Sequence, residues 1–402
     1  MTRQLRSGYT TGACAAAAAK GAALMLVRQE LVSEVTIDLP AGVPATFELR
    51  GQEFDPESAV CYVIKDAGDD PDVTNGAEVH ARVALTPALS QGEREQKITI
   101  TGGIGIGKVT KPGLAVPPGE WAINPVPRRM ITEAVHSVFS TFNIQYSTFN
   151  LSVVISIPDG EQRAQKTLNA RLGIMGGLSI LGTSGIVRPI SAKAWTDTLD
   201  ATLDVARACG CETVVLSTGR TSEMAAQCYL NPPPPLMGGG EGEGEIATRD
   251  EYGSVPPTLT LPHRGGGDMS LPEEAFIMMG DHVAYALDSC RRHGFEHPLI
   301  ACQFAKLLKI ACGYENTHAA ASELDLATLR HWAEADGIPA HLIDLMAQAN
   351  TAREIIIASG FDQRLLELVC CRAHAVASRF APSLHARFLV ADYTGNIVFN
   401  SR

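Results

Sequence analysis

Apolar and polar positions along the first 168 residues predict a mixture of helices and strands. The alanine-rich stretch 10–28 is typical of a helix that Thr10 or Thr11 caps, because alanine is the best helix former and a threonine hydroxyl accepts from first-turn N–H groups. Further patterns indicate strands at 35–39, 59–65, 78–85, 97–101 and 154–157, and a helix at 126–143. These elements show no regular strand–helix alternation, so we predict an α+β domain over residues 1–168.

The pattern changes near residue 170, where each apolar run is followed at once by a helical pattern. The pairs are 172–182 and 192–208, 213–219 and 221–229, 275–280 and 281–292, and 298–304 and 305–311. This spacing indicates parallel strands joined by crossover helices. We therefore predict an α/β domain over residues 169–402 with a mostly parallel sheet, whose ligands bind beyond the carboxyl ends of the strands.

Two segments interrupt these patterns, at 85–96 (LTPALSQGEREQ) and at 231–270. The second is rich in Pro, Gly and Glu, which gives it few side chains with which to form a packed core. We predict that it is a disordered surface insertion, and that deleting 231–268 leaves folding and activity intact.

Composition narrows the class of protein. The chain has 402 residues, of which 45% are hydrophobic, and this length favours two domains. Its 33 basic and 44 acidic residues give a net charge of −11, which argues against a nucleic-acid partner or an anionic membrane surface. The N-terminus has no apolar signal region, no apolar run reaches the ~18 residues of a membrane span, and the ten cysteines form no CxxC. We predict a cytoplasmic protein with reduced thiols.

The stretch 102–113, GGIGIGKVTKPG, approximates a nucleotide-binding loop. Gly102, Gly107 and Lys108 fit the P-loop spacing, but Val109 stands where the magnesium-binding hydroxyl belongs. The glycines alternate as G-x-G-x-G, which also differs from the dinucleotide fingerprint. A nucleotide-dependent kinase or NTPase that uses residues 102–108 stays open as an alternative.

A second interpretation is that the loop carries cations towards an anionic ligand. Between residues 97 and 129 the chain has a net charge of +4, from Lys97, Lys108, Lys111, Arg128 and Arg129 against Glu120. Because the arginine fork binds carboxylates with two hydrogen bonds, this basic island predicts a site for a ligand with several carboxylates. The N-terminus of the helix at 10–28 is a further candidate anion site.

Signals for a metal site are weak. The aspartate-rich stretch 66–76 resembles a calcium loop, but Gly76 comes one position late. His293 and His297 have the spacing of zinc ligands, without an evident third ligand. We predict no bound metal.

Read together, the motifs of this chain resemble those of the cobalt-precorrin-5B carbon-1 methyltransferases of anaerobic cobalamin biosynthesis. The resemblance covers most of the chain outside the two insertions. It rests on LRSGYTTGACAAAAAK (5–20), VIKDAGDDPDVTNGAE (63–78), GIGKVTKPGL (105–114), INPVPRRMI (123–131), LGIMGGLSILGTSGIVRPIS (172–191), TGRTSE (218–223), MGDHVAYAL (279–287) and NTH (316–318). The chain departs from the family pattern at Ala170 and Trp121, where proline is expected, and at His282, where an aromatic residue is usual.

The resemblance implies methyl transfer from S-adenosylmethionine to carbon 1 of a cobalt-containing, ring-contracted tetrapyrrole, to give cobalt-precorrin-6A. Cobalt enters only as part of the substrate. The resemblance also implies that the second domain is Rossmann-like. A non-catalytic tetrapyrrole-binding protein is the remaining alternative, and a homo-oligomer stays open.

The resemblance and the residues together give a set of candidate site residues. The carboxylates of the macrocycle are assigned to Thr10, Thr11, Lys108, Thr110, Lys111, Asn124, Arg128 and Arg129. The cosubstrate is assigned to Gly176, Gly177, Gly182, Thr183, Ser184 and Gly185, and to Ser217, Thr218, Gly219, Arg220 and Asp281. Asn316 and His318 complete that site, and Asp66 and His318 are the candidates for catalytic proton transfer.

Overall fold

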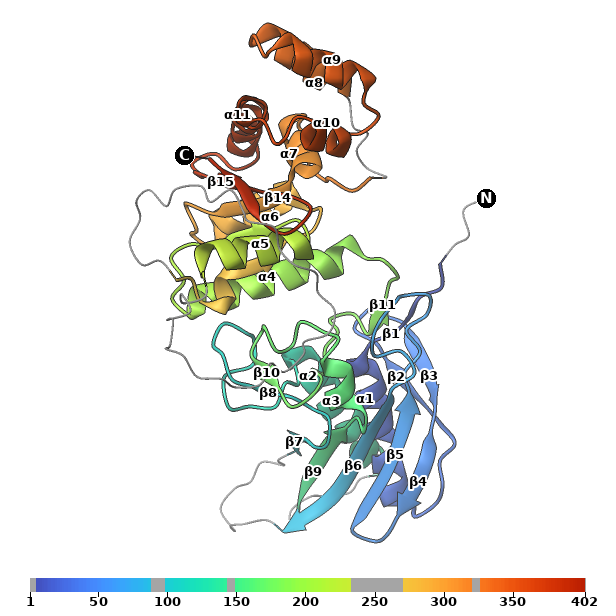
Figure 1. Ribbon diagram of the computed structural model, residues 1–402. Coiled ribbons are helices and arrows are strands. Elements are labelled where there is room, and N and C mark those ends of the chain that lie inside the picture. Colours follow the sequence, from blue (N-terminus) through green and yellow to red (C-terminus); the bar gives the residue numbers. More distant parts are fainter. Residues whose placement is uncertain (1–4, 88–97, 143–148, 233–269, 320–325, 402) are drawn as a thin grey trace, which may run out of the picture. The chain divides into compact units, whose positions relative to one another are not determined.

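The computed structural model has a mixed α/β architecture with several sheets, some of whose strands are parallel (Figure 1). It describes residues 5–87, 98–142, 149–232, 270–319 and 326–401. The chain divides into two compact units, Met1–Cys209 and Gly210–Arg402. The predicted domain boundary at residue 168 stays a prediction. The predicted insertions lie outside the described residues from 88 to 96 and from 233 to 269.

The first unit is built on a five-stranded sheet with the strand order β4-β5-β6-β9-β7. All neighbours are antiparallel except β7 and β9, which are parallel. The strands are β4 (Arg50–Phe54), β5 (Ser58–Ile64), β6 (Glu78–Pro87), β7 (Ile98–Gly102) and β9 (Phe149–Ser156), and a separate hairpin joins β2 (Glu34–Asp38) to β3 (Pro44–Glu48). The predicted strands of this half are confirmed, with small shifts at most ends, except that β9 begins five residues before the predicted 154–157.

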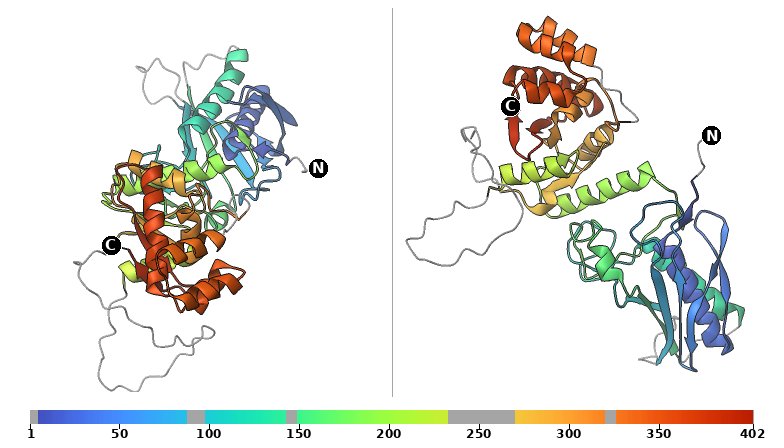
Figure 2. Two further views of the ribbon diagram at one scale, coloured as in Figure 1. Left: turned by 90° about the horizontal axis from the view of Figure 1, so that it is seen from above. Right: turned by 45° about the vertical axis from the view of Figure 1, so that its right-hand side comes forward.

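Helix α1 (Thr11–Arg28) packs against β5 and β6 and lies beside α2 (Pro125–Thr141) (Figure 2). Thr10 caps it as predicted, since its hydroxyl accepts from the N–H of Ala13 at 3.2 Å. The alanines of its first turns are at most 1% exposed, because side chains this small let strands and a second helix approach on every side. The start of α1 is therefore enclosed by the unit.

The run 172–182 does not form the predicted strand of a parallel sheet. It lies in the first unit, where its one strand, β10 (Ile174–Met175), pairs with β8 (Lys108–Val109), and Leu178 and Ile180 form isolated bridges. The physical reason is its glycine content: a Cβ on Gly177 would lie 2.3 Å from the carbonyl oxygen of Gly105, so this backbone packs directly on another backbone. The remaining elements of this unit are β1 (Gly8–Tyr9), β11 (Ile186–Val187), α3 (Gly160–Ala164) and α4 (Ala192–Ala208).

The second unit contains a five-stranded sheet with the order β13-β12-β14-β15-β16. The first four strands are parallel and β16 is antiparallel to β15, which confirms the predicted parallel pairing. Its strands are β12 (Val215–Ser217), β13 (Phe276–Met278), β14 (Leu299–Gln303), β15 (Arg387–Ala391) and β16 (Ile397–Asn400). Its helices are α5 (Arg220–Leu230), η1 (Glu273–Ala275), α6 (Val283–Arg292), α7 (Phe304–Ala311), α8 (Leu326–Ala335), α9 (Ala340–Gln348), α10 (Ala352–Ala358) and α11 (Gln363–Phe380).

Both faces of this sheet are covered. Leu299 and Ala301 of β14 join the apolar cluster beneath α5, while the alternate residues Ile300 and Cys302 are also fully buried. Because successive strand residues point to opposite faces, both faces exclude water, as in α/β proteins with crossover helices. Helix α7 packs on β14 and β15, and α11 packs on α6 and α7. Because the faces are covered, a ligand has access at the ends of the strands, and in such sheets it binds beyond their carboxyl ends.

The two ends of the predicted second insertion meet in the structure. The side chain of Asn231 donates to the carbonyl oxygen of Leu271 at 2.7 Å and accepts from its N–H at 2.8 Å. We expect that replacing 233–269 with a short Gly-Ser linker keeps the melting temperature within about 3 °C of the full chain, because closing the same ends with fewer residues costs little entropy. Asn231→Ala, which removes both bonds, should lower the free energy of unfolding by about 1–3 kcal/mol in either background. A linker variant that aggregates or loses the cooperative transition contradicts this expectation.

Candidate functional site

Several motif segments that are distant in the sequence meet in the first unit, around the starts of α1 and α2 (Figure 1). They are joined by backbone hydrogen bonds rather than by side chains alone. These bonds run from Tyr9 N to Asp66 O (2.7 Å), Thr10 N to Gly185 O (3.1 Å), Gly12 N to Leu181 O (3.0 Å), Thr110 N to Gly173 O (2.7 Å) and Asn124 N to Ile180 O (3.0 Å). The structure therefore brings the predicted macrocycle residues and the glycine run 173–185 into one assembly.

The glycine-rich loop 102–113 does not offer its backbone to a phosphate group. Its N–H groups donate within the protein, from Gly103 to Ile155, from Gly107 to Leu178 and from Val109 to Glu120, at 2.7–2.9 Å. The side chain of Val109 is 1% exposed. A phosphate cradle needs N–H groups that point at the ligand, so these three bonds disfavour the nucleotide alternative for this loop.

The three candidate side chains of this loop have different surroundings. Lys108 is exposed, with its ammonium 4.6 Å from the centre of the Trp121 ring, and no carboxylate of the described residues forms an ion pair with it. Thr110 donates its hydroxyl to the carbonyl of Gly173 at 2.8 Å, and Lys111 donates to the carbonyl of Arg171 at 3.2 Å. Lys108 is thus the side chain of this loop that is placed for an outside anion.

The arginine pair that was predicted to clamp carboxylates is split by the structure. The guanidinium of Arg128 donates to the backbone carbonyls of Ile123 (2.9 Å), Ile100 (3.2 Å) and Trp121 (3.3 Å). Arg129 is exposed and forms a long ion pair with Glu133, at 3.8 Å. Arg128 therefore fixes the backbone ahead of α2, and Arg129 keeps its donors towards solvent.

Thr10 and Thr11 are buried, at 6% and 3% exposure. The Thr11 hydroxyl contacts both backbone groups of Leu181, at 3.1 and 3.2 Å, and the N–H of Gly12 donates to the same residue. Their binding role stays a prediction, and the contacts show that they hold the segment 181–185. Asn124 is the N-cap residue of α2 and makes no side-chain capping bond, which leaves its amide without a structural task there.

The predicted cosubstrate residues fall into two groups. Gly176, Gly177, Gly182, Thr183, Ser184 and Gly185 belong to the first unit. A Cβ on Gly182 would lie 2.4 Å from the Thr10 hydroxyl oxygen, whereas one on Gly176 would meet nothing within 4 Å. Ser184 closes a local turn by accepting from the N–H of Ile186. Ser217, Thr218, Gly219, Arg220 and Asp281 belong to the second unit.

The second group stands at the carboxyl end of β12, where α5 begins. The hydroxyl oxygen of Ser217 is buried and has no hydrogen-bond partner among the described residues. Gly219 is the N-cap residue of α5 and makes no capping bond, and a Cβ there would meet nothing within 4 Å. A buried hydroxyl without a partner, two residues from a glycine with open space around it, has the properties of a group that can bind a polar ligand atom.

Two further residues with ionisable side chains near these strand ends were not among the residues selected from the sequence. Glu223 is 0% exposed although its side chain is polar, and it accepts from Arg220 at 2.8 Å. Lys306 on α7 donates to Asp281 and to the carbonyl oxygen of Thr317. The signal for Glu223 was its place in the TGRTSE motif, whereas nothing in the pattern of α7 sets Lys306 apart.

Asp281 joins the loop after β13 to the NTH motif. It accepts from the Thr317 hydroxyl at 2.7 Å as well as from Lys306. Burial alone would raise the pKa of this carboxyl, but the bonds from Lys306 and Thr317 outweigh burial and lower it. Asn316 accepts from the backbone N–H of His318, whose side chain is exposed. The ionised Asp281 thus fixes the loop that carries His318.

Asp66 forms a two-pronged ion pair with Arg6, at 2.5 and 2.8 Å. The Arg6 hydrogen bond lowers the pKa of this carboxyl, which makes it a weaker base near neutral pH. Asp66 lies in the first unit and His318 in the second. The catalytic roles assigned to both stay predictions.

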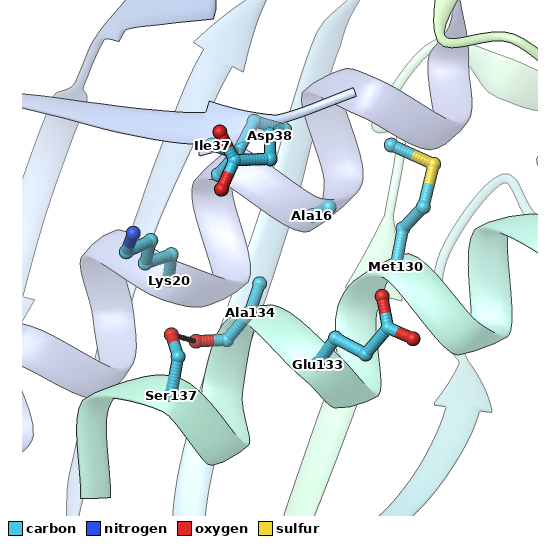
Figure 3. A pocket seen from close by; sticks show the side chains of 8 residues that line it. All are labelled: Ala16, Lys20, Ile37, Asp38, Met130, Glu133, Ala134 and Ser137. Carbon is cyan, nitrogen blue, oxygen red and sulfur yellow. Dashed lines mark hydrogen bonds between the residues drawn. The ribbon is translucent and has the colours of Figure 1, made fainter. Parts of the chain in front are cut away.

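A groove of about 240 Å³ on the first unit is lined by none of the candidate residues, although its Glu133 is the ion-pair partner of Arg129 (Figure 3). Lys20 of α1, Asp38 of β2 and Glu133 of α2 are among its lining residues. Two carboxylates in its lining would repel the carboxylate arms of a tetrapyrrole, so this groove does not suit that substrate.

The part of the chain that the structure describes offers no sign of two other classes of site. No cluster of at least three His, Cys, Asp or Glu side chains there has the arrangement of a metal site. None of the described helices combines the length and the apolar character that crossing a bilayer demands.

Comparison with protein families gives two matches to this chain. The family model "CbiD" matches residues 1–189, and the model "CbiD, C-terminal domain" matches residues 316–402. The two matches contain most of the motif segments described above.

Curated relatives extend the likeness to nearly the whole chain. A cobalt-precorrin-5B C(1)-methyltransferase of Pelobacter propionicus is 60% identical over 398 residues, which cover 99% of this chain and 96% of that protein. Proteins of the same name from Geobacter metallireducens (54% identical, 99% of both chains) and Priestia megaterium (40% identical, 92% and 90%) are also similar. A crystal structure of a cobalamin biosynthesis protein from Archaeoglobus fulgidus is 26% identical and covers 75% of this chain and 78% of its own, with a TM-score of 0.35.

Proposed function

This chain belongs to the CbiD family, and from its relatives we infer that it is an enzyme that methylates carbon 1 of cobalt-precorrin-5B to give cobalt-precorrin-6A. The observation that carries this function is the 60% identity to a protein of that name over 99% of the chain. The relatives are named as methyltransferases, which disfavours a non-catalytic tetrapyrrole-binding protein.

The cobalt-precorrin binds, in this proposal, to the assembly of motif segments in the first unit. Lys108 and Arg129 provide exposed cations for the acetate and propionate arms of the macrocycle. Arg128 supports them indirectly, since its three bonds to backbone carbonyls hold the segment between the loop and α2. The amide of Asn124 is a further candidate contact at the start of α2.

The methyl donor in this proposal is S-adenosylmethionine, bound at the carboxyl ends of the parallel strands in the second unit. Strand β12 lies between β13 and β14, both of which follow it in the chain, and ligands of α/β sheets bind at such switch points. This order, with helices α5 and α6 as crossovers, supports a Rossmann-like arrangement. The buried, unpartnered hydroxyl of Ser217 fits a ligand with many polar atoms, and Gly219 leaves room beside it.

The donor, when bound, supplies an electrophilic methyl group. The tasks of the protein are then to bind, to orient and to exclude water, which together provide most of the rate enhancement in such transfers. Ser217 would orient the donor through its hydroxyl, and Asp281, held ionised by Lys306 and Thr317, keeps the adjoining loop in place. No proton transfer by a named group is needed for this account.

Binding measurements separate the proposed donor from the nucleotide alternative. We expect S-adenosylhomocysteine to bind, by titration calorimetry, and to raise the melting temperature, whereas ATP with magnesium does neither. Ser217→Ala should weaken S-adenosylhomocysteine binding by about tenfold, because one hydrogen bond to a buried donor is lost. The proposal fails if S-adenosylhomocysteine does not bind even when the cobalt-precorrin is present.

The two arginines should separate binding from stability. Arg129→Ala is expected to weaken cobalt-precorrin-5B binding by about tenfold, through the loss of one carboxylate contact, without a change in unfolding. Arg128→Ala should instead lower the free energy of unfolding by about 1–3 kcal/mol, because three carbonyl groups lose their donor. Absorbance titration and urea denaturation measure the two effects. A wild-type affinity in Arg129→Ala contradicts the proposed contact.

A further inference from the structure

A second buried hydroxyl lies, like that of Ser217, at the carboxyl end of a parallel strand. Tyr393 comes two residues after Ala391, the last residue of β15, and β15 runs parallel to β14 and β12. Ala301 is paired with both Ser217 and Leu389, so these two lie level with each other, two strand spacings or roughly 10 Å apart. Tyr393 therefore lies on the same side of the sheet, beyond the carboxyl ends of the strands, as the proposed donor site.

The hydroxyl of Tyr393 has no hydrogen-bond partner in the part of the chain that the structure describes. Its oxygen is buried, and it is one of three such side-chain atoms among the described residues, of which Ser217 provides another. The turn that carries Tyr393 is fixed by Asp392, which accepts from the N–H groups of Thr394 (2.9 Å) and Asn396 (2.8 Å). A buried hydroxyl without a partner destabilises a protein unless a ligand or water satisfies it. A buried hydroxyl without a partner in a turn fixed this well is suited to a polar ligand atom.

A cation lies over the ring of this tyrosine. The guanidinium of Arg353, at the start of α10, stands 4.3 Å from the centre of the Tyr393 ring. None of the described acidic residues forms an ion pair with Arg353, whose side chain belongs to an exposed residue. An arginine fork and a phenol hydroxyl are both hydrogen-bond donors, and together they suit an anionic acceptor such as a carboxylate or a phosphate. Of these two groups, S-adenosylmethionine has only the carboxylate.

We propose that Tyr393 and Arg353 bind the carboxylate of the amino-acid end of the methyl donor, while Ser217 binds a polar atom nearer its nucleoside. This inference rests on the proposed donor. An adenosyl amino acid is an elongated ligand, and an elongated ligand spans more than one strand end. Neither residue belongs to the motifs that identified the family, because the turn after β15 shows no distinctive pattern in the sequence.

Two ligands that differ only in the amino-acid part test the proposal by titration calorimetry. S-adenosylhomocysteine has the carboxylate, and 5′-methylthioadenosine lacks it. We expect Tyr393→Phe and Arg353→Gln each to weaken S-adenosylhomocysteine binding at least about tenfold and to leave 5′-methylthioadenosine binding unchanged. The melting temperature of Tyr393→Phe should equal or exceed that of the wild type, because the variant removes a buried polar atom that has no partner.

Tyr229→Phe is the matched control, since the hydroxyl of Tyr229 has a protein partner, the amide of Asn400 at 3.2 Å. It should lower stability slightly and leave S-adenosylhomocysteine affinity unchanged. If Tyr393→Phe binds S-adenosylhomocysteine as the wild type does, the inference is overturned while the proposed donor stands. If the variant instead loses affinity for cobalt-precorrin-5B, the carboxylate is an arm of the macrocycle and the assignment to the donor is wrong. If the wild type binds no S-adenosylhomocysteine, the proposed donor itself has failed.

Discussion

Replacing Gly105 with alanine is expected to lower the free energy of unfolding of this enzyme by more than about 3 kcal/mol, or to prevent folding. Gly105 has a φ of +71°, and a Cβ there would lie 1.9 Å from the carbonyl oxygen of Ile157. Backbone atoms at that distance must move apart, and the contacts with Gly160 and Gly177 would be lost together. Urea denaturation, followed by circular dichroism, measures the loss.

Two matched variants separate the steric contact from the backbone conformation. Gly176→Ala has a similar φ of +82° but open space around the Cβ, so it should cost only about 1–2 kcal/mol. Gly160→Ala has no positive φ, yet its Cβ would lie 2.2 Å from the Gly105 carbonyl oxygen, so it reports the contact alone. Equal losses in Gly105→Ala and Gly176→Ala would show that these glycines serve conformation and not close packing.

Asp72→Ala is the second substitution for which we expect a large effect, a loss of about 3–5 kcal/mol. The side chain of Lys65 is 1% exposed, and its ammonium is 2.5 Å from an oxygen of Asp72. Removing the carboxylate leaves a buried charge without its counter-ion. The exposed pair of Arg6 and Asp66 is the control, since Arg6→Ala should cost at most about 1 kcal/mol.

The same pair predicts a dependence of stability on pH. Burial raises the pKa of Asp72, but Lys65 and Thr74 lower it further, so the net shift is downward. A lowered pKa in the folded state gives stability that is present above the unfolded pKa of about 3.9 and is lost as pH falls through the folded value. The difference in unfolding free energy between wild type and Asp72→Ala should therefore shrink below about pH 4. A difference that stays constant to pH 2 contradicts this linkage.

The sequence predicted the elements of this fold better than their assembly. The alanine helix and the strand–helix pairs from 213 to 311 have strong periodicity, and the structure confirms them. The run 172–182 was wrongly predicted as a sheet strand, because apolar residues between glycines suit both a buried strand and close backbone packing. Residues after 311 were assigned no elements, although β15 completes the parallel part of the sheet.

In the candidate site, too, the sequence indicated which residue types matter but not where their side chains lie. Arg128 and Arg129 are adjacent and chemically identical in the sequence, yet the first donates to three backbone carbonyls and the second faces solvent. Ser217 was selected through its motif, but its lack of a partner is visible only once the sheet surrounds it. Tyr393 could not be selected from the sequence, because nothing near it marks the end of a parallel strand.

The most direct test of the central claim is a methyl-transfer assay with purified enzyme, cobalt-precorrin-5B and S-adenosylmethionine that carries a ¹³C-labelled methyl group. We expect one labelled methyl group on carbon 1 of the macrocycle by NMR, formed together with S-adenosylhomocysteine, and a slower transfer at low donor concentration for Ser217→Ala. Label on another carbon, or no transfer by a folded enzyme that binds both ligands, would contradict the account.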